Sequence, residues 1–269
     1  MKPEPHILKG IISGIVPLPI KRFYWKNMRP KVFSGAFKNF SEIKDEHPWE
    51  SEEWIELSRQ KLQAIDNLST EGKPLGGYLS LTAKLINKLS EKETVKVLDF
   101  AGGTGFVYFR IFPYLMAQSN VSWHVVDSAA LIDIGRKHMT KSHRLSFSEV
   151  LPYAGDRFDI VFINTALQYM EDHRGLLKKL LSYHSKYFIF TRLLAGNIET
   201  HVTSEIIFKR KTPCRFLKIQ DIISFFGNEG FDVLLSDHNR EESLSWQYSK
   251  DIPSAMRIPY SMDIVFKRR

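Results

Sequence analysis

A glycine-rich turn follows directly on an apolar strand near the middle of the chain. Residues 97–109 read VLDFAGGTGFVYF, so a strand pattern leads into Gly102, Gly103 and Gly105 and then into a helical pattern. Glycine has no Cβ atom, and the turn therefore lets a ligand approach the backbone while amides at the start of the next helix face that ligand. A strand, a glycine turn and a helix in this order predict an α/β sheet with a binding site at a strand end.

Strand and helix patterns alternate from residue 93 onward. The runs FDIVFIN (158–164) and YFIFT (187–191) are almost wholly apolar, which is typical of strands covered on both faces. We therefore predict an α/β fold with a doubly wound, Rossmann-like and mostly parallel sheet over residues 93–269. The expected strands are 95–100, 121–127, 144–150, 158–164, 187–191, 231–235 and 262–266. The expected helices are 105–118, interrupted or ended early near Pro113, and 129–139, 175–183 and 217–228.

Residues 32–92 are predicted to form a helical cap region. Residues 32–47 resemble loop and short helix, and apolar residues then recur at helical spacing over 54–68. Lys61 is the only polar residue in that apolar series. A second helix is expected over about 75–89. With an N-terminal tail (1–31), this gives three parts: tail, helical cap and catalytic domain (93–269).

The tail combines apolar and basic residues. Its segment ILKGIISGIVPLPIKRFYWK (7–26) is too short, and too broken by Pro17 and Pro19, to span a bilayer. The pattern is compatible with lying on an anionic membrane face, and the alternative is a tail that packs on its own domain or on a second subunit. Much of the net charge of +8 comes from this tail. The single cysteine, Cys214, excludes an intrachain disulfide and fits a reducing compartment, so we expect a cytoplasmic protein, peripheral on the inner membrane face if the tail binds there.

Two ligand classes compete for the glycine turn. A dinucleotide site requires glycine where Tyr108 stands, and no tyrosine has the lysine four residues later that short-chain dehydrogenases need. Asp99 stands on the strand before the turn, where it can bind the turn's amides or a positively charged amino group. Asp127 ends the next strand, 22 residues after Gly105, where a carboxylate can accept both hydroxyls of a ribose. These acids favour S-adenosyl-L-methionine over NAD.

The segment SEVLPYAGDRFDIVF (148–162) resembles the stretch that lines the adenine edge in class I S-adenosylmethionine-dependent methyltransferases. The resemblance implies that Ser148, Glu149 or their backbone meets the adenine. The following NTALQYMEDH resembles the end of that family's fourth strand. It implies that Asn164 lies near the methionine moiety and that Gln168 and Tyr169 lie near the transferred methyl group.

A narrower resemblance covers residues 32–269. The blocks LDFAGGTGFVYFR, WHVVD, IGRKH, LSF, ALQYMED and FIFTR, in this order, are similar to a family of methyltransferases from bacterial surface-polysaccharide gene clusters. Ala101 replaces the first glycine of that family's turn. The resemblance implies methyl transfer in a glycan-related setting. The predicted cofactor-binding residues are Asp99, Ala101, Gly102, Gly103, Gly105, Asp127, Ser148, Glu149, Asn164 and Gln168.

Methyl transfer to a sugar hydroxyl needs an aligned acceptor and a base. Tyr169, His173, Arg192 and His201 are candidates because they lie near the ends of the fourth and fifth strands. Arg192 could hold a carboxylate or phosphate of the acceptor, or form an ion pair. His173 could instead be an exposed residue at a helix start, and His201 a solvated residue in a hairpin over the site.

Neither the nine histidines nor the lone cysteine shows metal-ligand spacing, so we expect no metal. The sequence contains no RNA-binding signature, and we expect no specific nucleic-acid partner. The predicted function is an O-methyltransferase acting on a sugar, glycan or glycolipid. The alternatives are a non-catalytic domain that keeps the cofactor pocket and a methyltransferase for RNA or another small molecule.

Overall fold

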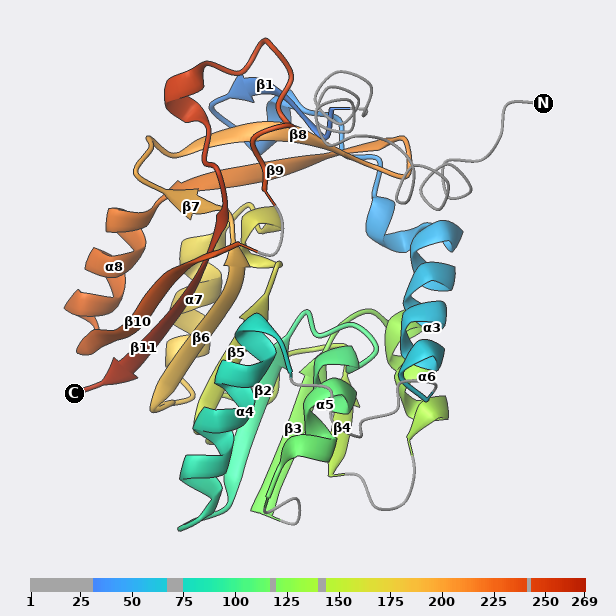
Figure 1. Ribbon diagram of the computed structural model, residues 1–269, viewed down its shortest axis with the longest axis vertical. Coiled ribbons are helices and arrows are strands. Elements are labelled where there is room, and N and C mark those ends of the chain that lie inside the picture. Colours follow the sequence, from blue (N-terminus) through green and yellow to red (C-terminus); the bar gives the residue numbers. More distant parts are fainter. Residues whose placement is uncertain (1–30, 67–74, 117–119, 140–143, 241–242) are drawn as a thin grey trace, which may run out of the picture.

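The computed structural model describes residues 31–66, 75–116, 120–139, 144–240 and 243–269 (Figure 1). The strands are β1 (Phe33–Phe37), β2 (Val95–Phe100), β3 (Val121–Val126), β4 (Leu145–Ser148), β5 (Ile160–Asn164), β6 (Tyr187–Leu193), β7 (Ala195–Gly196), β8 (His201–Ile207), β9 (Arg210–Lys218), β10 (Phe231–Asn239) and β11 (Ser261–Arg268). The α-helices are α3 (Glu52–Asp66), α4 (Gly77–Ser90), α5 (Phe106–Ile111), α6 (Ala129–His138), α7 (His173–Leu181) and α8 (Ile219–Asn228). Short 3₁₀ helices include η1 (Phe40–Glu42), η2 (Pro48–Glu50), η3 (Phe112–Tyr114), η5 (Leu167–Tyr169) and η6 (Ser254–Met256).

The main sheet has seven strands in the order β10-β11-β6-β5-β2-β3-β4. Strands β4, β3, β2, β5 and β6 pair in parallel, and β11 inserts antiparallel between β6 and β10. Within this sheet, the first strand along the chain is β2, and β3 and β4 follow on one side of it. The next strand, β5, lies on the other side of β2. Strand order therefore reverses between β2 and β5, which is where an open α/β sheet leaves a crevice at the carboxyl ends of its strands.

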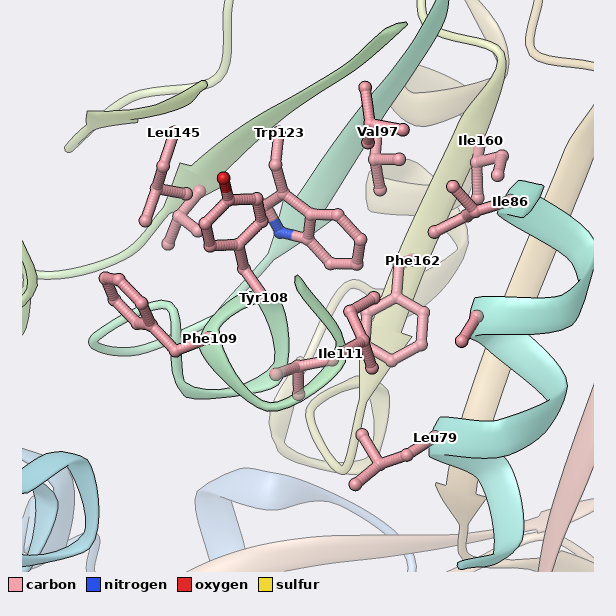
Figure 2. Packing of buried hydrophobic residues seen from close by; sticks show 14 of the residues in the cluster. Leu79, Ile86, Val97, Tyr108, Phe109, Ile111, Trp123, Leu145, Ile160 and Phe162 are labelled. Carbon is pink, nitrogen blue, oxygen red and sulfur yellow. The ribbon is translucent and has the colours of Figure 1, made fainter. Parts of the chain in front are cut away.

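The central strands β2, β5, β6 and β11 of the main sheet are buried on both faces, and adjacent residues of each strand point to opposite faces. On one face, Val97 and Trp123 pack with α4, α5 and α6, and the Trp123 ring lies 5.9 Å from those of Tyr108 and Phe162 (Figure 2). On the other face, Leu98 and its neighbours pack with α7 and α8. This double coverage explains the continuous apolar strand sequences and leaves only the strand ends for polar chemistry.

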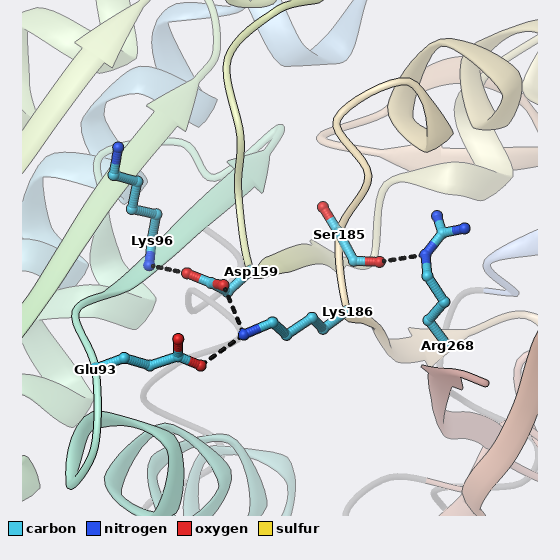
Figure 3. A network of polar contacts seen from close by, with 6 residues as sticks. All are labelled: Glu93, Lys96, Asp159, Ser185, Lys186 and Arg268. Carbon is cyan, nitrogen blue, oxygen red and sulfur yellow. Dashed lines mark hydrogen bonds and ion pairs between the residues drawn. The ribbon is translucent and has the colours of Figure 1, made fainter.

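The amino-terminal edge of the sheet is joined by polar contacts (Figure 3). The Lys186 ammonium lies 2.5 Å from a carboxylate oxygen of Glu93 and 3.6 Å from one of Asp159. The other carboxylate oxygen of Asp159 accepts a hydrogen bond from the Lys96 amide at 2.9 Å. These contacts connect the starts of β2, β5 and β6 at the edge opposite to the glycine turn.

A second sheet lies above the carboxyl ends of the main strands in Figure 1, with the order β1-β8-β9-β7. Strands β7, β8 and β9 are inserted between β6 and α8, whereas β1 comes from the N-terminal region and pairs with β8. Its core contains Phe33, Cys214 and Phe216 together with residues of the segment before β11, such as Tyr248. The predicted hairpin around residue 201 is confirmed as β8 and β9.

The predicted strands and helices of residues 93–269 are confirmed, including the end of a helix at Pro113, where α5 gives way to η3. Residues 33–37 differ from the prediction, because they form β1 rather than loop or short helix. The sequence FSGAF is too short to signal a strand without its partner β8. The predicted tail lies outside the described residues except for Lys31.

Substitution of alanine for glycine should have opposite effects on stability at two helical positions, Gly135 and Gly227. A Cβ atom at Gly135 in α6 would lie 2.5 Å from the carbonyl oxygen of Thr104, so this glycine lets α6 pack directly on the glycine turn. A Cβ atom at Gly227 in α8 would meet nothing within 4 Å. We expect Gly135→Ala to lower the free energy of unfolding by about 1–3 kcal/mol through overpacking. Gly227→Ala should raise it by up to about 1 kcal/mol.

Urea denaturation of both variants measures these changes. Equal effects of the two alanines would contradict the assigned contact between α6 and the turn.

Candidate active site

Three neighbouring strands each have a residue with strained backbone at or just after the carboxyl end. Ala101, Thr165 and Arg192 adopt left-handed φ values of 54°, 55° and 55° at the ends of β2, β5 and β6. Such conformations cost a residue with a side chain on the order of 1–3 kcal/mol and tend to persist at functional sites. The strain marks this edge of the sheet as the candidate site.

The glycine turn is fixed on one side and open on the other. The Gly103 amide donates a hydrogen bond of 2.7 Å to the Asp127 carboxylate, and the Ala101 amide donates one of 2.8 Å to the Val126 carbonyl at the end of β3. Gly103 has a φ of 61°, and a Cβ atom there would meet nothing within 4 Å. The turn thus presents bare backbone to open space at the point where strand order reverses.

Asp127 organises this turn. Its second carboxylate oxygen accepts a hydrogen bond of 2.7 Å from the Ser128 amide. Burial raises the pKa of Asp127, while the amides of Ser128 and Gly103 act in the opposite direction. A carboxylate has about four acceptor positions. Asp127 therefore retains capacity for ligand hydroxyls after binding both amides.

Asp99 lies beneath the turn and is fully buried. It accepts a hydrogen bond of 3.0 Å from the Trp123 indole, and its other oxygen has no partner among the described residues. A Cβ atom at Gly102 would lie 2.5 Å from the carboxyl group. Burial raises the pKa of Asp99 to about 8. The hydrogen bond from Trp123 lowers this pKa, and the negative charge of Asp127 raises it further. Asp99 thus binds an indole rather than the turn's amides, as a mainly neutral acid.

The residues expected near the adenine flank the end of β4. The Ser148 carbonyl accepts from the Asp127 amide at 3.2 Å, and its hydroxyl donates to the Val150 carbonyl at 2.6 Å. The Glu149 side chain is exposed. These contacts place the Ser148 backbone directly beside Asp127.

Asn164 and Gln168 lie at and after the end of β5. The Asn164 side-chain oxygen accepts hydrogen bonds from the hydroxyls of Thr165, at 3.1 Å, and Thr191, at 2.9 Å. Gln168 is 1% exposed, and neither atom of its carboxamide has a hydrogen-bond partner in the described part of the chain. A buried amide without such a partner is costly, and the Gln168 side chain also lies beside the Tyr169 hydroxyl.

Tyr169 connects the two sheets. Its hydroxyl donates a hydrogen bond of 2.8 Å to the Glu205 carboxylate on β8. Burial raises the pKa of both Tyr169 and Glu205, and the buried Cys214 thiol lies beside Glu205. Sequence analysis missed Glu205. The alternation of HVTSEII could have identified it, because it places Glu205 on the same face of β8 as His201.

His173 is held by Arg215. The Arg215 guanidinium donates to the His173 Nδ1 at 2.7 Å and to the carbonyls of Met170 and Glu171 at 2.8 and 3.0 Å. Burial and then the charge of Arg215 lower the pKa of His173 to about 4. The imidazole also lines a cavity of about 190 Å³ beside α8. It is therefore neutral near pH 7, and its Nδ1 lone pair is already occupied.

His201 belongs to the core of the second sheet. It is 4% exposed, its ring stacks on Phe216 at a centroid distance of 5.3 Å, and its Nδ1 lies 3.0 Å from the Glu199 carbonyl. His201 is thus not a solvated loop residue. Arg192, in contrast, is exposed at the carboxyl edge, and its backbone amide donates to the Asp263 carboxylate at 2.8 Å. The predicted ion pair of Arg192 does not occur among the described residues.

No protein-family model and no curated protein matches the sequence. Solved structures do match. A chain of the Haloferax volcanii complex that contains a methyltransferase activator has 12% identity and a TM-score of 0.50, with 79% of this chain and 95% of that chain covered.

Two further matches have 14% identity. An S-adenosylmethionine-dependent methyltransferase from Clostridium acetobutylicum has a TM-score of 0.49, with 79% of this chain and 99% of that chain covered. The glycopeptide N-methyltransferase MtfA, complexed with S-adenosyl-L-homocysteine, has a TM-score of 0.47, with 77% and 98% covered. The fold predicted from the sequence, an α/β fold with a doubly wound, Rossmann-like and mostly parallel sheet, is confirmed by the strand order of the main sheet, and the Haloferax volcanii match shares it.

The buried carboxyl of Asp99 predicts a pH-dependent stability. Its pKa in the folded protein is about 8, above the ordinary value of 3.8, so folding favours the protonated acid. This stabilisation is complete below about pH 4 and is lost as the pH rises through about 8, with a slope of up to about 1.4 kcal/mol per pH unit. Asp99→Asn should remove this part of the slope, because asparagine does not ionise.

Urea denaturation between pH 5 and pH 8.5 measures both slopes. Asp156→Asn is the matched control, since Asp156 is exposed. Parallel stability curves for the wild type and Asp99→Asn would show that the acid ionises freely.

Proposed function

We propose that the chain is a methyltransferase that uses S-adenosylmethionine. The observation that carries this proposal is the open backbone at Gly103, whose amide is bound by Asp127 at the end of the neighbouring strand. The spare acceptor capacity of Asp127 fits ribose hydroxyls, and the unpartnered carboxamide of Gln168 fits a polar ligand at the β5 end. When bound, this cofactor supplies an activated methyl group. The protein's own residues then align the acceptor and exclude water.

We further propose the residue roles that the sequence suggested. Gly102, Gly103 and Gly105, with Ala101, form the turn under the methionine and ribose, and the backbone of Ser148 with Glu149 borders the adenine. Asp99 becomes a counter-ion only when a cation lies next to it, because a nearby positive charge lowers the pKa of an acid. The proposed base is Tyr169 acting with Glu205: because its hydroxyl donates to that carboxylate and its pKa is raised, Tyr169 can accept the acceptor's proton only by passing its own proton to Glu205. The Nδ1 lone pair of His173 is occupied by Arg215, and His201 is buried in the core of the second sheet.

The proposed acceptor is a sugar, glycan or glycolipid, as the resemblance to methyltransferases of surface-polysaccharide gene clusters suggests. The support lies in Arg192, exposed at the end of β6, which can meet a carboxylate or phosphate in a bidentate manner. The basic residues of the β8–β9 hairpin give less support for an anionic acceptor. Arg215 is engaged with His173, and Arg210 lies 3.8 Å from the Glu53 carboxylate. A non-catalytic cofactor-binding domain and an enzyme for RNA or another small molecule are the competing functions.

Calorimetry tests the cofactor. We expect S-adenosylhomocysteine to bind and NAD not to bind. Asp127→Ala should weaken binding by on the order of 2–3 kcal/mol, because it removes hydrogen bonds to a charged group. Asp133→Ala, which removes an exposed acid of α6, is the control and should bind as the wild type does. Tight NAD binding, or an unchanged Asp127→Ala variant, would refute the proposed cofactor.

We also propose a cytoplasmic location with peripheral membrane contact through residues 1–30, which lie outside the described residues. None of the described helices combines the length and apolar character needed to cross a bilayer. The full chain should co-sediment with anionic liposomes and do so less at high salt, since each basic side chain contributes about 1 kcal/mol near such a surface. Deletion of residues 1–30 should abolish co-sedimentation and keep S-adenosylhomocysteine binding. A truncated protein that unfolds would instead assign the tail a structural role.

A further inference from the structure

Three aromatic side chains form a continuous series from α3 to the end of β5. The Trp54 and Trp49 rings lie 4.8 Å apart between centroids, and the Trp49 and Tyr169 rings lie 4.7 Å apart, both edge to face. All three residues are only partly buried. They thus offer aromatic surface beside η5, where the sequence resemblance places the transferred methyl group.

Two cations accompany this aromatic series. The Lys61 ammonium lies 5.3 Å from the Trp54 ring centroid, and partial burial followed by the charge of Arg192 lowers the pKa of Lys61. Arg192 follows Thr191, which pairs with Asn164 at the end of β5, so Arg192 lies at the β5 end of the aromatic series and Lys61 lies at its α3 end. Among the described residues, neither forms an ion pair with a carboxylate.

The Asp263 carboxylate next to Arg192 is engaged by other groups than the guanidinium. The Asp263 carboxylate accepts the Arg192 amide at 2.8 Å and the Asn239 side-chain amide at 3.1 Å. Asp263 thus holds the strained backbone, which has a φ of 55°, and the Arg192 side chain stays exposed. Two neighbouring cations without a counter-ion favour an anion between them.

We propose that Lys61, Arg192, Trp49 and Tyr169 form an acceptor subsite for a sugar ring that carries a phosphate or a carboxylate. The cations bind the anionic group, and the aromatic rings pack against the C–H groups of the sugar. C–H groups carry a partial positive charge that suits the negative face of an aromatic ring. This subsite rests on the proposed methyltransferase function and adds Lys61 and Trp49, which the sequence did not assign to the site.

The position of Arg192 favours the acceptor over the carboxylate of the cofactor. The glycine turn follows β2, whereas Arg192 lies on β6, and β5 separates these strands. Neighbouring strands are about 4.8 Å apart, so the two strand ends are separated by about 10 Å along the sheet. The anion bound by Arg192 thus lies on the acceptor's side of β5.

Calorimetry on protein saturated with S-adenosylhomocysteine tests the subsite with four probes. These are glucose 1-phosphate, glucuronate, glucose and inorganic phosphate. We expect at least one charged sugar to bind more tightly than both glucose and inorganic phosphate. Lys61→Gln and Arg192→Gln should each weaken that binding about tenfold or more, because a charge-assisted hydrogen bond is lost. Trp49→Leu should weaken charged sugars but not inorganic phosphate.

Lys178→Gln is the matched control, since Lys178 is exposed on α7 and the substitution removes the same charge. It should leave all affinities unchanged, and every variant should bind S-adenosylhomocysteine as the wild type does. Wild-type protein that fails to bind S-adenosylhomocysteine refutes the proposed cofactor and therefore the function. Protein that binds it but no charged sugar refutes only the subsite. Weaker S-adenosylhomocysteine binding by Lys61→Gln and Arg192→Gln would assign the two cations to the cofactor's carboxylate and overturn the inference.

Discussion

Burial of the central strands of the main sheet on both faces is the constraint on which the rest of the structure depends. Helices α4, α5 and α6 cover one face, and α7 and α8 cover the other, so no polar group can act there without a large desolvation cost. Chemistry is confined to the two edges where strands begin and end. Contacts of Lys186 with Glu93 and Asp159 occupy the amino-terminal edge. The carboxyl edge is left with strained backbone, buried acids and open space at Gly103.

Two carboxyl groups at that edge have different tasks because their surroundings differ. Asp127 binds two backbone amides and remains partly accessible, which suits an acid that shapes a turn and meets hydroxyls. Asp99 is sealed against an indole, and its pKa of about 8 keeps it mainly neutral. A ligand cation would change the ionisation of Asp99 far more than that of an exposed acid. Asp127 thus supplies a fixed contact with the glycine turn, whereas the charge of Asp99 depends on whether a cation binds beside it.

The sequence predicted the main sheet because its signals are local. Apolar runs, glycine turns and the break at Pro113 each depend on neighbouring residues, and they gave the correct order of strands and helices. It did not predict β1, because FSGAF becomes a strand only through pairing with β8. For the site, the positions of Gly103 and Asp127 followed from spacing. Glu205 and Trp49 did not, since both reach Tyr169 through contacts between distant segments. The roles expected for His173 and His201 rested on position along the chain, which carries no information about Arg215 or Phe216.

Strand β1 is synthesised long before β8, the strand with which it pairs. The Thr203 hydroxyl donates to the Ser34 carbonyl, a contact between residues 169 positions apart. At synthesis rates of about 5–20 residues per second, β1 emerges roughly 10–30 s before its partner strand exists. During that interval its backbone amides and carbonyls are satisfied by water or by a chaperone. The second sheet is therefore assembled late, only after the strands that hold the glycine turn have been made.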